Sequence, residues 1–439
     1  MSKFIIDKIG PIEHVDFILN KVNVLIGPQS SGKSTIAKVV SFCLWLEKDV
    51  LMHRSSDYVN RNFVEKQLLE FHRLRNYLNE GYAISFVGDA IDFAYTKDVC
   101  FARLKDKFEE CKIGKVAYIP AERNAVTLPN IASLKMPEYN TRSFIFDWLE
   151  IHQKFQKKDA VDLLKLKLKY YYDESSQKDM IVLEDGKEIG LEEASSGLQS
   201  VVPLYVYVYY LTHWVYDHQE DASFDKKEKI EKALANEFFK MLAKEMDGAV
   251  NERLLDTMKN GQLVQKINEM LGEARALKKT GGVSMNDLLE TVLKLEENIS
   301  YPHYSNIILE EPELNLFPET QKDLVYDLLG MINSGRDHLL MATHSPYLLY
   351  ALNNCMLGYL AKENIPEEDE ALQMMKDSFI KPENVSVWEI KDGKFLPYKE
   401  NPNYTIQDER GLIRNNYFDR IMKNIMTDFS ALMDYCDED

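Results

Sequence analysis

The sequence predicts an α/β fold in which helices flank a mixed β-sheet. Three observations support this prediction. The apolar run Val22–Ile26 is typical of a buried strand, a glycine-rich loop follows it directly, and a helical segment begins at Thr35. A strand, a glycine-rich loop and a helix in this order form the context in which such a loop binds phosphate groups. Strand-like runs return much later, at Asn306–Glu310 and His338–Thr343, so distant parts of the chain are expected to share one sheet.

Short strands and three hairpins are expected on both sides of the loop. Apolar runs or polar–apolar alternation predict the strands, and Gly88-Asp89, Asp185-Gly186 and Asp392-Gly393 are typical hairpin turns. In order, the expected strands are Phe4–Ile9, Val15–Leu19, Val22–Ile26, the hairpin of Ala83–Val87 and Ala90–Tyr95, Lys115–Ile119, Lys165–Tyr172, the hairpin Met180–Leu191, Asn306–Glu310, His338–Thr343 and the hairpin Val385–Lys399.

Helical segments occupy most of the remaining chain. The expected helices are Thr35–Leu46, Lys48–Glu80, Arg142–Leu164, most of Leu198–Asn298 with breaks at Asp217–Asp225 and at glycines, a helix after His344, and Asp408–Tyr435. Glu363–Glu370 is expected to form an acidic loop. This order predicts four segments: residues 1–205 form the first part of one α/β head, 206–300 a helical insertion, 301–400 the second part of the head, and 401–439 a C-terminal helix with an acidic tail.

The composition indicates a cytoplasmic protein with a large core. The chain has 439 residues, of which 45% are hydrophobic. It contains no apolar run of about eighteen residues, which a membrane-spanning helix would need, and no signal peptide is expected. The five cysteines are scattered and form no C-x-x-C pair, so we expect reduced thiols rather than disulfides or zinc ligands.

The glycine-rich loop has every residue that a nucleotide phosphate site requires. It consists of Gly27, Pro28, Gln29, Ser30, Ser31, Gly32, Lys33 and Ser34, and Thr35 follows it. Backbone N–H groups of such a loop surround a polyphosphate, and the following helix adds positive charge at its N-terminus. Lys33 is expected to reach the β- and γ-phosphates, and the Ser34 hydroxyl to bind Mg²⁺. ATP with Mg²⁺ is therefore the expected cofactor pair.

Two acidic residues end the apolar strand at Asn306–Glu310. Ligands of open α/β sheets bind at the carboxyl ends of the strands, where Glu310 and Glu311 are placed. We expect Glu310 to hold the metal, and Glu311 to orient or deprotonate the attacking water. The alternative is a strand that merely ends in exposed acids.

A histidine ends the next apolar strand, and a serine-rich turn precedes a long apolar helix. His344 follows Leu339–Thr343, and we expect it to contact the γ-phosphate, although a histidine after a strand is often only structural. The turn contains Ser195, Ser196, Gly197 and Gln199. Hydroxyls and a glycine at a helix N-terminus can bind an anion, but they can also be an ordinary helix cap.

The order of these motifs resembles the nucleotide-binding head of ABC-type ATPases. More narrowly, it resembles the branch that contains RecF, SMC proteins and the OLD ATPases. The residues that carry this narrower resemblance are Gly10-Pro11-Ile12, Tyr118-Ile119-Pro120-Ala121-Glu122-Arg123, Glu310-Glu311-Pro312-Glu313-Leu314-Asn315-Leu316-Phe317-Pro318 and Thr343-His344-Ser345-Pro346. It covers roughly residues 1–205 and 300–400.

The resemblance implies a role for each motif. Glu310 is the metal carboxylate, Glu311 the catalytic base, His344 the switch, and Ser195–Gly197 the signature loop that closes on the nucleotide of a second subunit. Two heads would then enclose two ATP molecules head to tail. This chain departs from transporters in having Ser196 where they have glycine, and in having Glu310 where aspartate is commoner. Glu122-Arg123 stands about where a metal-contacting glutamine is usual.

The resemblance also implies a partner protein. The chain is similar to ATPase subunits of bacterial anti-phage systems such as Septu and PARIS, so we expect a homodimer or higher homo-oligomer that controls a separately encoded effector, for example a nuclease. The short segment after His344 predicts no nuclease in this chain. The alternative is a RecF- or SMC-like ATPase that acts on DNA in repair or recombination. A transporter subunit is disfavoured by the long spacing between the signature loop and the acidic strand.

Charge argues against DNA as the main partner. The formal net charge is −18, which opposes the many lysine and arginine contacts that duplex DNA requires. A local lysine-rich stretch lies between residues 154 and 169, with six lysines and two aspartates. We interpret it as a solvated face, with DNA contact as the less favoured alternative.

Overall fold

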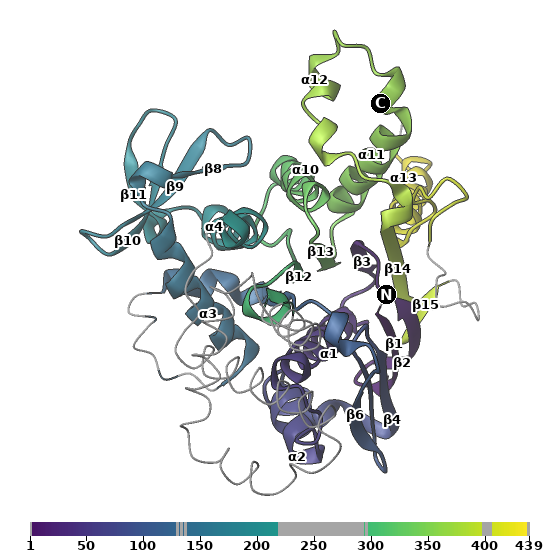
Figure 1. The fold of residues 1–439 in the computed structure, drawn as a ribbon. Coiled ribbons are helices and arrows are strands. Elements are labelled where there is room, and N and C mark those ends of the chain that lie inside the picture. Colours follow the sequence, from purple (N-terminus) through teal and green to yellow (C-terminus); the bar gives the residue numbers. More distant parts are fainter. Residues whose placement is uncertain are drawn as a thin grey trace, which may run out of the picture.

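The α/β prediction is confirmed. The computed structural model describes residues 2–128, 131, 135, 138–217, 294, 297–396 and 406–436. Within these residues the main element is an 11-stranded mixed sheet (Figure 1). From one edge to the other its strands are β6 (Cys100–Leu104), β5 (Ile91–Thr96), β4 (Leu78–Val87), β1 (Lys3–Ile9), β2 (Ile12–Ile18), β15 (Lys394–Leu396), β14 (Val385–Lys391), β3 (Val22–Ile26), β13 (His338–Ala342), β12 (Ser305–Glu310) and β7 (Lys115–Ile119).

The sheet has a parallel half and an antiparallel half. Strands β14, β3, β13, β12 and β7 are parallel, and β3 lies between β14 and β13 with all five residues buried. Strands β6, β5, β4, β1 and β2 pair antiparallel. The short strand β15 joins the halves, because it pairs with β14 and meets β2 at Lys394 and His14. Distant parts of the sequence therefore share one sheet, as expected.

Helices cover both faces of the parallel half. Helix α1 (Lys33–His53) packs on one face with apolar side chains such as Leu25 and Ile308. Helices α4 (Ser196–Tyr209), α10 (Pro318–Ser334) and α11 (Pro346–Ala361) pack on the other face, toward which Val24 points. Alternate side chains of a strand point to opposite faces, so each buried strand contributes to both cores.

A second, four-stranded antiparallel sheet lies beside α4. It consists of β8 (Val161–Leu163), β9 (Leu168–Asp173), β10 (Lys178–Val182) and β11 (Glu188–Gly190), in the order β11-β10-β9-β8. It confirms the hairpin predicted at Met180–Leu191. The helix predicted at Arg142–Leu164 is wrong in its second half, because α3 (Asn140–Ile151) ends early. Buried Val161 and Leu163 pair with β9 as a strand instead.

The continuous helix predicted at Lys48–Glu80 is also wrong. Helix α1 ends at His53, and Arg54 takes a left-handed conformation with φ 54°. Only short helical turns follow, among them α2 (Arg61–Val64), before β4 begins at Leu78. Tertiary packing explains the break, since Val64 and Leu68 turn inward to join the core around α1.

Helix α13 (Tyr417–Met433) starts later than the predicted Asp408. The segment before it is a turn in which Asp408 accepts hydrogen bonds from the N–H groups of Arg410 and Leu412. Asn416 then begins the helix with a capping box to Asp419. Strand β6 and helix α10 are not among the elements that the sequence predicts.

Some predicted segments lie outside the described residues. Most of the helical insertion at 206–300, the end of the last hairpin and the final acidic residues of the tail belong to this group. In the part of the chain that the structure does describe, no helix is long and apolar enough to cross a membrane.

A buried carboxyl group ties α1 to the turn between β4 and β5. Glu47 is 7% exposed, and its Oε1 accepts hydrogen bonds from the N–H groups of Ala90 at 2.7 Å and Ile91 at 3.3 Å. Burial raises the pKa of Glu47 from 4.5 to about 7, and the two backbone hydrogen bonds only partly oppose this shift. The folded state therefore holds this proton at pH values at which the unfolded chain has released it.

Stability should consequently fall as pH rises. The contribution of Glu47 is fully present below about pH 4.5 and is lost as pH rises through about 7. Between pH 5 and 8.5, the free energy of unfolding of the wild type should fall by roughly 3 kcal/mol more than that of Glu47→Gln. Urea unfolding at several pH values measures this difference, with Glu367→Gln on the exposed acidic loop as the control. Equal pH dependence of wild type and Glu47→Gln would contradict the assignment.

Candidate functional site

The glycine-rich loop joins the buried strand β3 to helix α1. Gly27 and Gly32 have φ angles of 149° and 101°. A Cβ on Gly27 would lie 2.6 Å from the carbonyl oxygen of Ile390, and one on Gly32 would lie 2.3 Å from Cδ1 of Ile12. Both positions favour glycine by conformation, and Gly27 also by space, because its neighbour is a backbone oxygen whereas Ile12 Cδ1 is the end of a flexible side chain. The loop predicted from sequence has the strand–loop–helix context that phosphate binding requires.

Lys33 folds back over this loop. Its Nζ donates hydrogen bonds to the carbonyl oxygens of Gly27 and Pro28, each at 2.9 Å. Burial lowers its pKa to about 8, while Glu311 and Glu313 oppose that shift. A buried ammonium group held by neutral carbonyls would gain a stronger partner in an anionic phosphate.

A cavity of about 490 Å³ opens beside the loop and brings together residues from five parts of the chain. Its lining is Gly10, Pro11, Gln29, Ser30, Ser31, Gly32, Lys33, Ser34, Thr35, Asn76, Tyr77, Glu311 and His344. Most of the predicted loop and both predicted catalytic residues thus line one cavity. Asn76 and Tyr77 were not expected there, because the sequence signal at Lys48–Glu80 favoured a helix. Tyr77 presents a 41% exposed ring, which could stack on a nucleotide base.

Glu310 and Ser34 form a pair that fits a hard cation. Glu310 ends β12 and is 6% exposed. Burial raises its pKa, and the nearby hydroxyl groups of Ser34 and Tyr118 oppose this shift. Its Oε1 has no hydrogen-bond partner among the described residues. An unpartnered carboxylate oxygen beside a serine hydroxyl suits Mg²⁺, which binds few protein oxygens and takes its other ligands from phosphate and water. The described residues contain no cluster of three or more His, Cys, Asp or Glu side chains that could hold a metal ion.

Glu311 follows directly and has an unusual backbone. Its φ is 43°, uncommon for a non-glycine residue, and its N–H donates to the carbonyl oxygen of Ala342 at 2.9 Å. This turn takes the side chain away from the buried position of Glu310 and into the cavity with Lys33. Adjacent carboxylates are therefore divided between two environments, one buried beside Ser34 and one facing the cavity.

His344 lies in the same cavity and is held by a residue to which the sequence analysis gave no role. The carboxylate of Glu313 accepts hydrogen bonds from the N–H of His344 at 2.5 Å and from Oγ1 of Thr343 at 2.8 Å. Burial lowers the pKa of His344, and the charge of Lys33 lowers it further. The imidazole is therefore neutral near pH 7 and can donate or accept one hydrogen bond. The only sequence feature that pointed to Glu313 was its place in the motif Glu310-Glu311-Pro312-Glu313.

Arg123 connects the loop that follows β12 to helix α4. It is fully buried, and its guanidinium donates to five carbonyl oxygens: Pro120, Ser200, Glu310, Glu311 and Pro312, at 2.8–3.3 Å. Burial lowers its pKa to about 10, opposed by the nearby glutamates. Its neighbour Glu122 is instead exposed and lies 3.5 Å from Arg73. The sequence left the roles of Glu122 and Arg123 open. In the structure Arg123 is a buried structural residue, whereas Glu122 lies at the surface.

The predicted signature residues lie at the start of α4 and do not line the cavity. The Ser195 hydroxyl caps the helix by accepting from the N–H of Leu198 at 3.4 Å. Asn315 Nδ2 donates to the Ser200 hydroxyl at 2.9 Å, and a Cβ on Gly197 would lie 3.0 Å from the Asn315 carbonyl oxygen. The start of α4 therefore packs against the loop that contains Asn315, and Ser195 and Ser196 are exposed. The cap geometry accounts for Ser195 without a ligand, so the signature role stays a prediction.

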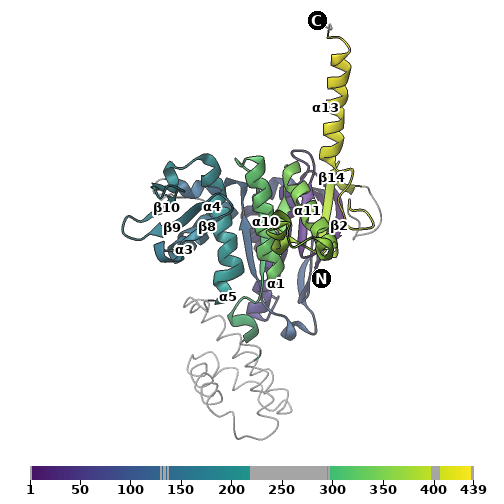
Figure 2. The ribbon, with the colours of Figure 1, turned by 90° about the horizontal axis from the view of Figure 1, so that it is seen from above.

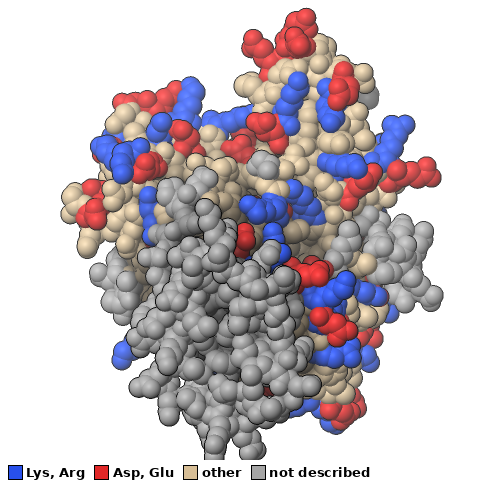
Figure 3. Space-filling view, viewed as in Figure 1, with Lys and Arg blue, Asp and Glu red and all other residues tan. Residues whose placement is uncertain are grey.

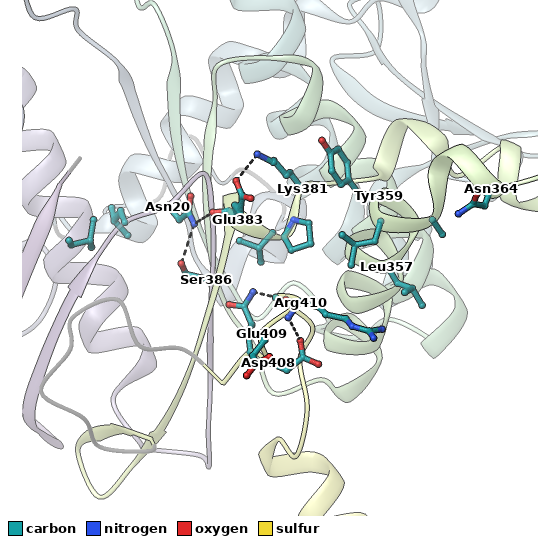
Figure 4. Close-up of a pocket in the computed structure, with 18 residues that line it drawn as sticks. Asn20, Leu357, Tyr359, Asn364, Lys381, Glu383, Ser386, Asp408, Glu409 and Arg410 are labelled. Carbon is teal, nitrogen blue, oxygen red and sulfur yellow. Dashed lines mark hydrogen bonds and ion pairs between the residues drawn. The ribbon is translucent and has the colours of Figure 1, made fainter.

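A larger cavity, of about 1060 Å³, lies between α11, β14 and the segment around Asp408 (Figure 4). Two of its polar side chains interact with Glu383: Asn20 Nδ2 donates to its carbonyl oxygen at 2.7 Å, and Lys381 lies 2.5 Å from its carboxylate. The smaller cavity beside the loop is the better functional candidate, because it brings together the phosphate loop, Glu311 and His344.

The lysine-rich stretch is largely neutralised by neighbouring acids. Lys157, Lys167 and Lys169 pair with Glu188, Glu184 and Asp162 at 2.7, 2.5 and 3.2 Å. On the face shown in Figure 3, basic and acidic side chains are interspersed over the described surface. The arrangement supports the solvated-face interpretation.

Comparison with known proteins gives only distant similarities. Neither a protein-family model nor a curated protein matches the sequence. Among solved structures, the chain is similar to the SMC head domain from Thermotoga maritima, with 10% identity, a TM-score of 0.30, and 80% of this chain and 90% of that chain covered. It is also similar to the recombination mediator protein RecF, with 12% identity, a TM-score of 0.27, and coverages of 90% and 96%. For MJ1267, an ATP-binding cassette of an ABC transporter, the identity is 10%, the TM-score 0.28, and both coverages 92%. These scores are too low to carry an argument about function.

Removal of the Arg123 guanidinium should destabilise the fold strongly. Arg123→Met removes a donor from five carbonyl oxygens, although that of Glu311 keeps a second donor in the N–H of Leu314, so the free energy of unfolding should fall by at least roughly 3 kcal/mol. Chemical unfolding measures this loss. Arg103→Met is the matched control, because Arg103 is 72% exposed and pairs only at the surface with Asp92. The control should lose less than about 1 kcal/mol. A similar loss in both variants would contradict the clamp role of Arg123.

Proposed function

We propose that this chain is a Mg²⁺-dependent ATPase of the ABC type that hydrolyses ATP in head-to-tail dimers. The observation that carries the proposal is the meeting of Lys33, Glu311 and His344 in one cavity, beside the Ser34–Glu310 pair. A phosphate-binding loop, a cation site, a candidate base and a neutral imidazole are the parts that phosphoryl transfer to water requires.

The loop and Lys33 would bind and orient the triphosphate. Backbone N–H groups at the start of α1 face the phosphates, and Lys33 exchanges the carbonyls of Gly27 and Pro28 for phosphate oxygens. Ser34 and Glu310 would hold Mg²⁺, which when bound neutralises charge on the β- and γ-phosphates. The exposed ring of Tyr77 is placed to stack on the adenine.

Glu311 and His344 would act on the attacking water. Glu311 faces the cavity, so its carboxylate is placed to accept the proton of a water aligned with the γ-phosphate. The neutral imidazole of His344 is placed to donate a hydrogen bond to a γ-phosphate oxygen. The carboxylate of Glu313 accepts a hydrogen bond from the N–H of His344 and would so fix the position of the imidazole relative to the loop.

The serine-rich turn would complete the site of a second subunit. It is exposed and lies outside the cavity of its own chain, which supports a role in trans. In such a dimer, ATP favours the closed state because its γ-phosphate contacts both subunits, and hydrolysis removes that contact. Arg123 and Asn315 would then connect the serine-rich turn, which completes the site of the partner, to Glu311, which acts in the site of its own chain.

At the cellular level, we propose a switch or scaffold subunit of a bacterial anti-phage system with a separate effector. The motif resemblance and the paired lysines support this assignment over DNA binding. A RecF- or SMC-like repair ATPase is the second candidate, since its motifs belong to the same branch. Purification from the native host separates the two. A neighbouring gene product that co-purifies favours the switch, and DNA binding with steep salt dependence favours repair.

Glu311→Gln should separate binding from hydrolysis. The amide keeps the shape of the side chain but cannot accept a proton, so hydrolysis should fall at least about a hundredfold while ATP is retained. Nucleotide retention and phosphate release measure the two steps. Lys33→Ala is the control and should lose binding itself, because no neighbour replaces its charged donor. Hydrolysis by Glu311→Gln at the wild-type rate would rule out Glu311 as the base.

Mixing two inactive variants tests whether the site is shared. Lys33→Ala lacks a functional loop, and Ser195→Arg should block the turn that the partner uses. Each variant alone should be inactive, but a mixed dimer contains one intact composite site. When the two variants are co-expressed in equal amounts, half of the dimers are mixed, and the preparation should therefore recover up to about a quarter of wild-type hydrolysis. Lys33→Ala mixed with Lys33→Arg is the control. Full activity of Ser195→Arg alone would exclude the shared site.

A further inference from the structure

Helix α13 stands away from the rest of the molecule. Figure 2 shows it projecting from the body beyond β14, and none of its residues is buried. Its first turn is nevertheless firmly attached. Asp419 accepts a hydrogen bond from the Tyr350 hydroxyl at 2.7 Å, and Arg420 pairs with the buried carboxylate of Glu389. The body therefore fixes the direction of the helix while the following turns face solvent.

The exposed turns carry a broad apolar face. Its members recur at helical spacing and are between 41% and 88% exposed. They are Ile421, Met422, Ile425, Met426, Phe429, Leu432, Met433 and Tyr435. The opposite face is polar or small and includes Lys423, Thr427 and Ala431. An isolated helix of this length is marginal in water, and amphipathic helices gain most of their stability from a packed apolar face. This face therefore requires a partner.

We propose that α13 pairs with the same helix of a second copy of this chain. A stable interface of standard size takes about 800 Å² from each partner. The face can supply much of such an area, because its eight large side chains are each at least 41% exposed. Met422, Ile425, Phe429 and Leu432 follow the three- and four-residue spacing of a helix-pairing seam. The three methionines of the face have flexible side chains that adapt to an identical partner.

The charges of α13 fit a second copy better than a lipid surface. The helix carries Arg420 and Lys423 against Asp419, Asp428 and Asp434, all outside the apolar face. Helices that lie on anionic membranes have polar faces rich in lysine and arginine, which this helix does not. Because the charges on α13 nearly balance, two copies can approach along it despite the net charge of −18 of each chain.

Such pairing would have a direct consequence for nucleotide-driven closure, and this step rests on the proposed function. Two heads joined through α13 meet at a high effective concentration, so closure over ATP becomes an event within one dimer. The dimer then persists when nucleotide is released. The attached first turn transmits the pairing to β14, the neighbour of the phosphate-loop strand β3.

The test is the mass of the full-length protein without nucleotide, measured by light scattering or sedimentation over a range of concentrations. The wild type should be dimeric at micromolar concentration. Ile425→Glu combined with Phe429→Glu places two charges on the apolar face and should weaken association at least about a hundredfold. Thr427→Glu combined with Ala431→Glu is the matched control, because it adds the same charges at the same spacing on the opposite face and should stay dimeric.

The measurement decides the proposal independently of ATP hydrolysis. Lys33→Ala should keep the wild-type mass, since α13 pairing needs no nucleotide. The altered residues of both double variants are already exposed, so each should fold with wild-type circular dichroism. A monomeric wild type would overturn the proposal, whether or not the helix binds lipid vesicles or another protein. An unchanged dimer in the Ile425→Glu, Phe429→Glu variant would also overturn it.

Discussion

The site depends on the parallel register of three neighbouring strands. Leu25 of β3 pairs with Ala342 of β13, and Ala342 pairs with Glu310 of β12. Because all three strands run in the same direction, their carboxyl ends lie side by side. The phosphate loop, His344 and Glu311 closely follow these ends. Each side chain needs only a short turn to reach the common cavity. A shift of one residue in either pairing would reverse the faces of the strand and remove its side chain from the site.

Arg123 stabilises the turn that follows Glu310. The chain must turn sharply after Glu310, and the carbonyl oxygens of Glu310, Glu311 and Pro312 are left without partners in a strand or helix. Buried carbonyls without donors are destabilising. One planar guanidinium supplies donors to these groups and also reaches Ser200 of α4. The loop after Glu310 and helix α4 are therefore joined through one side chain, which would couple the two sites of a head-to-tail dimer.

The two dimer contacts that we propose would have different strengths and tasks. Pairing through α13 is apolar and independent of ligand, whereas closure of the heads depends on contacts to the γ-phosphate. A permanent contact of this kind allows the second contact to be weak and reversible, because the partner is always near. This division suits a protein that changes state with each nucleotide. Helix α13 is attached next to the parallel half of the sheet, so the permanent contact lies close to the element that carries the phosphate loop.

The sequence by itself determined the local units: β3 with its loop, the acidic end of β12, the histidine after β13 and the hairpins. These features depend on short-range pattern and turn chemistry, which a sequence displays directly. Tertiary structure alone decided the partners of Arg123 and Glu313, because hydrogen bonds to distant carbonyls leave no local pattern. It also broke the helix predicted at Lys48–Glu80, since burial of Val64 and Leu68 outweighed helical propensity and placed Tyr77 at the cavity. The apolar face of α13 could be read from sequence as amphipathic. Only the fold showed that nothing in the described chain covers it, because exposure is a property of the whole arrangement and not of the helix.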